Sequence, residues 1–159
     1  NRLLGLGPGE YLEVIAIDAA APAPAYPRWF RLDRFSGVPR LTNWIVRVDD
    51  LDQALAAAPA AGRAVDLARG DYRWRMGVPV DGCLPFDDCH PALIQWQGEM
   101  HPAQTLPDRG CRLVRLEITH PLADPLRAAL PLADPRISVT TGAPGLRAVI
   151  STPNGDVLL

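Results

Sequence analysis

Few side chains in this sequence combine a reactive type with a setting that favours chemistry. Glu13 is a lone carboxylate inside the apolar segment 10–17. Such a residue is either a functional acid or a partly exposed partner of an arginine. Arg73 and Arg75 alternate within segment 71–76, so both should project from the same face of a strand. Guanidinium groups suit a carboxylate or phosphate on a small ligand, although the same pattern fits the solvated face of an edge hairpin.

The histidines and cysteines give weaker indications of a functional site. Every histidine directly precedes a proline, at His90, His101 and His120. Proline favours extended backbone in the residue before it, which predicts loops or strand ends at these positions. The cysteines, Cys83, Cys89 and Cys111, match no zinc-binding spacing and are odd in number. We therefore expect free thiols, an ordinary surface loop around residues 83–91 and a reducing, cytoplasmic environment.

Composition excludes several classes of function. The chain has 159 residues and a net charge of −2, which gives no basic surface for nucleic acid or for a membrane. No apolar run is long enough to cross a bilayer. All 16 basic residues are arginine, which together with the alanine and proline content favours a bacterial source. Asn1 lies within a strand-like pattern, so we expect that the natural N-terminus lies upstream and that any targeting segment there is not visible.

Two stretches repeat the same pattern. Residues 44–59 and 114–131 each read as an apolar strand, a turn and an Ala/Leu-rich helix that ends at proline, and similar hairpins follow at 73–82 and 146–155. The offset of roughly seventy residues predicts a duplicated strand–helix–strands unit. The chain then divides into 1–40 (the tail of an incomplete unit and a Pro-rich connection), 41–110 and 111–159. This order predicts a single α+β domain of tandem βαβββ units, with a curved mixed sheet and helices on its outer face.

Strand alternation predicts which side chains share the concave face of that sheet. The helices are expected at about 50–58 and 122–130, and Trp44, Trp74 and Trp96 are expected to anchor the core. The polar residues predicted to line the concave face are Glu13, Asn43, Arg47, Arg73, Arg75, Gln95 and Gln97.

Several motifs resemble a known superfamily. The strand Tyr11-Leu12-Glu13-Val14 and the run from Val46 to Leu55 (VRVDDLDQAL) resemble the closing and opening strands of the vicinal oxygen chelate superfamily. The segments YLEVIAID, RGDYRWR, LIQW, HPA and LPDRGCRLV resemble, more narrowly, bacterial glyoxalase-like domain proteins. This resemblance implies paired βαβββ units around a small-molecule site, and homodimer formation is left open.

The resemblance also implies a set of site residues. Glu13 would serve as a ligand of a divalent metal or as a general base, and Asn43 and Gln95 occupy the usual positions of a histidine and a glutamate ligand. Neutral amides are poor replacements for those ligands, so the metal site departs from the family pattern. His101 belongs to the HPA segment, and Arg47, Arg73, Arg75, Gln95 and His101 would contact the substrate.

These features predict a glyoxalase-like enzyme of lyase or isomerase type that acts on a small, oxygenated, anionic metabolite. Two alternatives stay open: a protein that binds a small molecule without chemistry, and a structural domain whose cup is vestigial. Composition and motifs do not decide whether the protein is an enzyme.

Overall fold

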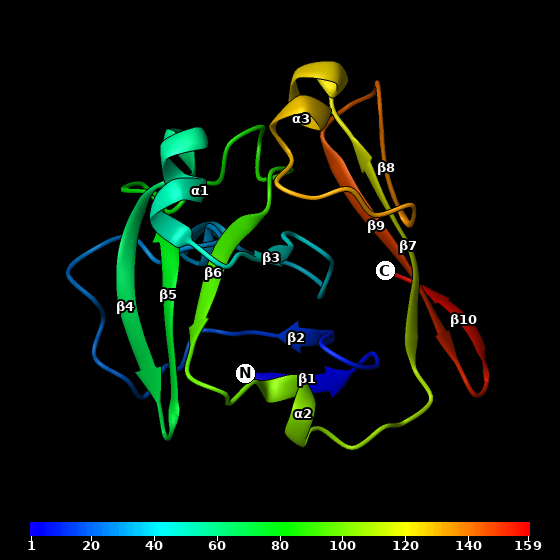
Figure 1. The fold of residues 1–159 in the computed structure, drawn as a ribbon, viewed down its shortest axis with the longest axis horizontal. Coiled ribbons are helices and arrows are strands. Elements are labelled where there is room, and N and C mark those ends of the chain that lie inside the picture. The colour runs from blue at the N-terminus through cyan, green and yellow to red at the C-terminus, as the bar shows by residue number, and fades with distance from the viewer.

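The computed structural model describes residues 1–159 and contains a two-stranded hairpin and two four-stranded sheets (Figure 1). The hairpin pairs β1 (Arg2–Gly5) with β2 (Tyr11–Val14) in antiparallel register, with Leu3 opposite Glu13. Gly7 and Gly9 both have positive φ angles in the connecting turn, a conformation that glycine adopts without steric cost. The long connection after β2 contains only a short 3-10 helix, η1 (Leu32–Arg34), as its many prolines predict.

The first four-stranded sheet has the order β3-β6-β5-β4, in which β3 and β6 are parallel. Its strands are β3 (Ile45–Arg47), β4 (Arg63–Arg69), β5 (Tyr72–Val78) and β6 (Ala92–Gln97). Helix α1 (Leu51–Ala57) begins at Asp50, whose side chain accepts the Gln53 backbone N–H at 3.0 Å as an N-cap. Leu51 and Leu55 of α1 pack with Leu93 on one face of this sheet. The short 3-10 helix η2 (Pro59–Ala61) then leads into β4.

The second four-stranded sheet has the order β10-β9-β7-β8. It contains β7 (Arg112–Thr119), β8 (Ile137–Thr140), β9 (Gly145–Thr152) and β10 (Gly155–Leu158), with α3 (Ala123–Ala129) between β7 and β8. The predicted strand–helix repeat is therefore confirmed in both places. The pairing differs, however, because β8 lies parallel beside β7, whereas the equivalent strand β4 lies at the far edge of the first sheet.

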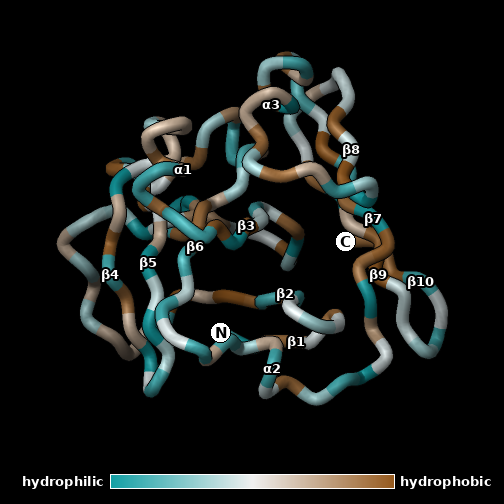
Figure 2. Tube along the Cα trace, viewed as in Figure 1, coloured by the Kyte–Doolittle hydropathy of each residue, from teal (hydrophilic) through white to brown (hydrophobic).

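The two helices also pack on different strands of their sheets, α1 on β6 and α3 on β7. Helix α1 covers the face of the first sheet that carries Leu93. Helix α3 packs through Ala123 and Leu126 on Leu116 and Ile118 of β7. This larger cluster is the main core of the second sheet, and Figure 2 shows hydrophobic residues where β7 and β9 run together.

The loop 83–91 joins the two four-stranded sheets. The Trp44 indole N–H donates to the Cys89 carbonyl at 2.9 Å, and Cys89 itself is buried in the core of the second sheet. His120 Nε2 lies 3.2 Å from Asp87, and His90 Nε2 lies 3.3 Å from the Ala129 carbonyl at the end of α3. The expectation of an ordinary surface loop is therefore wrong, because Leu84, Cys89 and His90 are buried and the loop holds the two halves together. All three cysteines are free, as the sequence predicts. None of the helices is both long and apolar enough to span a bilayer.

Candidate functional site

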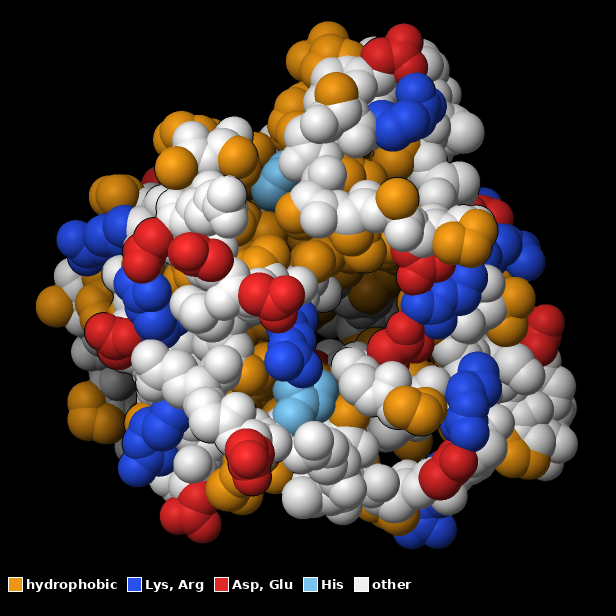
Figure 3. Space-filling view, in the orientation of Figure 1, with side chains coloured by type: hydrophobic (Ala, Val, Ile, Leu, Met, Phe, Trp, Pro, Cys, Tyr) orange, Lys and Arg blue, Asp and Glu red, His pale blue; other side chains and the backbone are white.

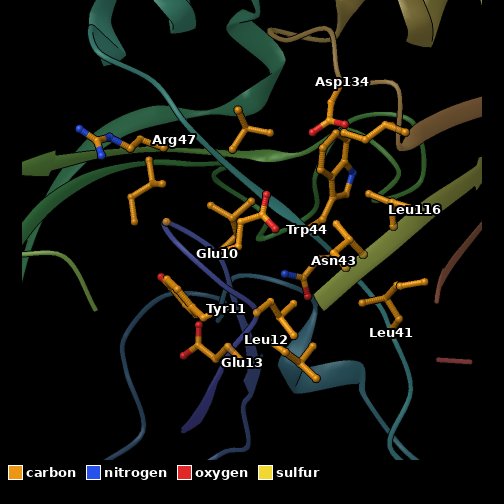
Figure 4. Close-up of a pocket in the computed structure, with 18 of the residues that line it drawn as sticks. Glu10, Tyr11, Leu12, Glu13, Leu41, Asn43, Trp44, Arg47, Leu116 and Asp134 are labelled. Atoms are coloured by element: carbon orange, nitrogen blue, oxygen red, sulfur yellow. The ribbon is translucent and has the colours of Figure 1, made fainter. Parts of the chain in front are cut away.

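A cavity of about 420 Å³ lies where the hairpin and the two four-stranded sheets meet. Figure 3 shows this face of the molecule hollowed near its centre, with hydrophobic side chains inside and charged side chains around the rim. The walls are mainly apolar, and the polar groups enter at particular points. Figure 4 shows Tyr11 and Glu13 side by side at one end of the cavity and Asp134 at the other. A cavity of this size and character is typical of a small-molecule site.

Glu13 lies on β2 and points into this cavity together with Tyr11, because residues two apart on a strand share a face. The Asn1 side-chain amide donates a hydrogen bond to the Glu13 carboxylate. Burial, followed by the charge of Glu13, raises the pKa of Tyr11 to about 12. The Tyr11 hydroxyl is therefore a neutral group beside a carboxylate.

His101 contributes a hydrogen-bond donor of fixed tautomer. It is the N-cap of α2 (Pro102–Thr105), and its Nδ1 accepts the Ala103 backbone N–H at 3.2 Å. The His101 backbone N–H in turn donates to Gln104 Oε1 at 3.2 Å. Burial, and secondly the nearby Arg47 charge, lower the pKa of His101, so the ring is neutral and carries its proton on Nε2. This Nε2–H has no protein acceptor, and His101 lines the cavity.

Arg47 and Asn43 approach from β3 and the residues before it. Arg47 is the last residue of β3, lines the cavity and forms no salt bridge. The Asn43 side-chain oxygen accepts a hydrogen bond from the Thr42 hydroxyl at 3.0 Å. Of the predicted site residues, the structure brings Glu13, Asn43, Arg47 and His101 together around one cavity.

The predicted positions of Gln95, Arg73 and Arg75 are wrong, because these side chains lie on the opposite face of the first sheet. Gln95 Nε2 donates to the Asp49 carbonyl at 2.7 Å, and Gln95 Oε1 accepts the Leu51 N–H at 3.4 Å, so this residue holds the start of α1. Both terminal nitrogens of Arg75 bond the Asp52 carboxylate at 2.9 Å. Arg73 bonds the Gly70 and Tyr72 carbonyls, and its strand partner Gln97 is exposed.

The physical reason is that the apolar face of this sheet turns toward the hairpin rather than toward the helix. Helix α1 has only seven residues and covers the sheet around Leu93, which leaves the rest of its face to solvent and to polar side chains. The larger apolar residues of β5 and β6 instead face a second cavity of about 720 Å³ beneath the hairpin. These residues are Trp74, Met76, Ile94 and Trp96. The expectation that Trp74 and Trp96 are core anchors is corrected accordingly, since both stay half-buried.

A charged cluster closes the other end of the first cavity. Arg136 bonds both carboxylate oxygens of Glu10, at 2.5 and 3.0 Å, and also bonds Asp134, with a shortest distance of 2.6 Å. The Arg136 hydrogen bonds keep the pKa of the Asp134 carboxyl below its ordinary value. No pattern in the sequence indicated this cluster, because Glu10 and Arg136 are 126 positions apart. Tyr11 was also missed as a site residue, although its shared strand face with Glu13 is a signal that could have found it.

The residues present do not fit a divalent metal. Nowhere in residues 1–159 do three or more His, Cys, Asp or Glu side chains gather in a way that could hold one. Gln95, one of the three predicted ligands, faces away from Glu13 and Asn43. Glu13 alone with a neutral amide oxygen is a weak donor set for a divalent ion.

Comparison with known proteins identifies the family to which this chain belongs. Searches of curated proteins and of solved structures found no significant match. The sequence profile described as glyoxalase-like domain matches residues 1–133, which is most of the chain. The α+β architecture with its two strand–helix units agrees with that match. The chain therefore belongs to the glyoxalase-like domain family, within the vicinal oxygen chelate superfamily.

Proposed function

We propose that this domain is an enzyme of lyase or isomerase type that acts on a small, oxygenated, anionic metabolite with an apolar body. One observation carries the proposal: Glu13, Arg47 and His101, whose Nε2–H has no acceptor in the protein, all line a single cavity whose walls are otherwise mainly apolar. The guanidinium would bind a carboxylate of the ligand, and the imidazole would donate to a carbonyl oxygen. Asn43 adds an amide beside them.

The same groups suit proton transfer at a carbon next to a carbonyl. Glu13 would take the proton from that carbon, and the electron pair of the broken C–H bond would move onto the carbonyl oxygen as an enolate. His101 Nε2–H and Arg47 would stabilise the negative charge that develops there. Return of the proton to a neighbouring atom would complete an isomerisation, and loss of a leaving group beside the carbanion would complete an elimination. Neither route needs a metal ion.

The second candidate function is binding without chemistry. It is favoured by the mainly apolar lining of the cavity, which would retain a ligand without assisting a reaction. Both candidates place the ligand in the same cavity and differ only in the role of Glu13. Homodimer formation, which the family resemblance leaves open, is a separate proposal that sedimentation velocity would test.

Hydrogen exchange in deuterated water separates the two candidates. The probe is 4-methyl-2-oxopentanoate, a 2-oxo acid with an apolar body, and proton NMR follows the hydrogens next to its carbonyl. For an enzyme we expect the wild-type protein to accelerate their replacement by deuterium, and Glu13→Gln to lower that rate by about 100-fold or more while leaving binding intact. Binding without exchange in the wild type would instead support the second candidate.

Two arginine variants provide a matched comparison. Arg47→Ala removes the cation that faces the cavity, whereas Arg73→Ala removes one from the opposite face of the sheet. We expect Arg47→Ala to weaken binding of the probe roughly tenfold and Arg73→Ala to leave it unchanged. Equal effects of the two substitutions would contradict the proposed site.

A further inference from the structure

Five aromatic rings from four segments of the chain form a continuous row beside Glu13. Within the first sheet Trp74 lies directly opposite Trp96 in the strand register, with ring centroids 5.4 Å apart. Tyr72 lies 6.0 Å from Trp96 on the same face. His101 lies 5.2 Å from Trp96, and Tyr11 of the hairpin lies 5.9 Å from His101. The row thus runs from the open end of β5 to the polar groups of the candidate site.

This row is not buried as a core would be. Tyr72, Trp74 and Trp96 are all half-buried, although they are among the largest side chains of the chain. Their remaining surface lines the cavity of about 720 Å³ beneath the hairpin. Leaving aromatic surface open to a cavity forfeits the free energy that burial would supply, so a concave aromatic wall of this kind points to a ligand.

The two cavities adjoin along β2. Tyr11, Glu13 and Trp96 line both of them, so the polar groups lie where the aromatic wall ends. The chemistry of the wall therefore changes along its length, from indole rings to a neutral imidazole donor, a phenol and a carboxylate. An amphipathic ligand with a flat apolar part and an oxygen-bearing end matches this gradient.

We propose that the ligand of this site carries a planar aromatic arm, which lies against Trp74 and Trp96 while its oxygenated end reaches Glu13 and His101. This assignment rests on the proposed function for the oxygenated end, and it adds the class of the remaining part of the ligand. Flat rings match the quadrupoles of tryptophan faces, which gives them an advantage over puckered rings of similar size and hydrophobicity.

The test compares flat and puckered rings in two matched pairs. The acidic pair is 3-phenyl-2-oxopropanoate and 3-cyclohexyl-2-oxopropanoate, and the neutral pair is benzyl alcohol and cyclohexylmethanol. Dissociation constants are measured by ligand-observed NMR with the wild-type protein. We expect the aromatic member to bind roughly three- to tenfold more tightly in each pair.

Variants of the wall show which residues cause the preference for aromatic rings. Trp74→Leu should bring the ratio of the two dissociation constants in each pair close to one. Tyr72→Leu, at the open end of the row, should reduce this ratio. The second variant keeps the test decisive if the first fails to fold. Trp74→Phe should preserve the ratio because it keeps a ring at this position. Arg73→Ala is the control on the same strand but the opposite face, and it should leave the ratio unchanged.

The outcomes separate this inference from the proposed function. A preference for aromatic rings in the neutral pair, together with no binding of either acid, would support the aromatic wall and contradict the proposed oxygenated ligand. Equal binding within both pairs would overturn the aromatic wall and leave the proposed function standing. A wild-type preference that survives in Trp74→Leu and Tyr72→Leu, or no binding of any of the four probes, would also overturn it.

Discussion

At the scale of single residues, the candidate site depends on groups whose protonation is fixed by their neighbours. His101 is the clearest example, because one ring nitrogen caps a helix and the residue lines the cavity. Glu13 was recognisable in the sequence as a carboxylate in an apolar strand. The state of His101 was not recognisable, because it depends on burial and on Arg47 from a strand more than fifty residues earlier.

His101 should make stability fall on the acid side of neutrality. Its pKa in the folded protein lies below the ordinary 6.5, so the unfolded chain binds the proton more readily. The free energy of unfolding therefore keeps its full contribution from neutral His101 above about pH 6.5, and this contribution declines as the pH falls toward the lowered pKa. We expect His101→Asn to flatten this dependence, because asparagine keeps an N-cap acceptor for Ala103 but does not titrate.

Urea unfolding of the wild type and His101→Asn between pH 5 and pH 8 measures this effect. His90→Asn provides the comparison, since His90 is also buried but lies in the 83–91 loop. If His101→Asn keeps the full wild-type pH dependence, the deduced state of His101 is wrong.

At the scale of elements, the sequence predicted both helices of the strand–helix units to within one residue at each end. The helix expected at 50–58 is α1 at Leu51–Ala57, and the one expected at 122–130 is α3 at Ala123–Ala129. Capping by Asp50 and the prolines that end each pattern explain this success. Strand pairing was not predictable in the same way, since the apolar pattern of β8 does not say whether β8 lies beside β7 or at the edge of the sheet.

The passage from the short helix η2 into β4 depends on one glycine. Gly62 has a φ of 107°, and a Cβ at this position would lie 2.1 Å from the backbone carbon of Val78. We expect Gly62→Ala to lower the free energy of unfolding by more than about 3 kcal/mol, because neither backbone can yield without breaking the β4–β5 ladder.

Gly70→Ala is the matched control for that substitution. Gly70 also has a positive φ, of 56°, but a Cβ there meets no atom within 4 Å. Its cost should be only the conformational one, about 1–2 kcal/mol. Chemical denaturation of both variants gives the comparison, and equal losses would show that the close approach of Gly62 to Val78 does not matter.

At the scale of the whole molecule, the hairpin that carries Glu13 is held against the second sheet by a charged link. Glu10 follows the turn of the hairpin, and Arg136 precedes β8. Because Arg136 is partly shielded and bonds two carboxylates, the link orients the hairpin more than an isolated surface pair would.

Removal of this link should loosen the hairpin without unfolding the protein. We expect Arg136→Ala to increase amide hydrogen exchange in residues 2–5 and 11–14 and to weaken ligand binding roughly threefold to tenfold through disorder at Glu13. Arg127→Ala is the control, because Arg127 bonds Asp124 and the Val139 carbonyl within the second sheet and its helix. Unchanged exchange in the hairpin of Arg136→Ala would show that other contacts hold it in place.

The sequence by itself determined the local elements and the family. Periodicity, caps and turn residues specify strands and helices through interactions between near neighbours, so the strand–helix repeat and the family motifs were readable. Glu13, Arg47 and His101, which the motifs and strand pattern singled out, all line the cavity. Only the tertiary structure decided which face of each strand meets the cavity. Alternation groups Trp74 with Met76 and Arg73 with Arg75, but both groups could face inward in an isolated strand.

The choice between the two faces depends on what covers the sheet. Helix α1 is too short to bury the aromatic face of β5 and β6, whereas the hairpin and the connection after it lie over that face. The aromatic residues therefore turn toward the cavity, and Arg75 and Gln95 turn toward Asp52 and the start of α1. Contacts between segments far apart in the chain made this choice, and for that reason the polar cup expected from the strand pattern is an aromatic one in the folded protein.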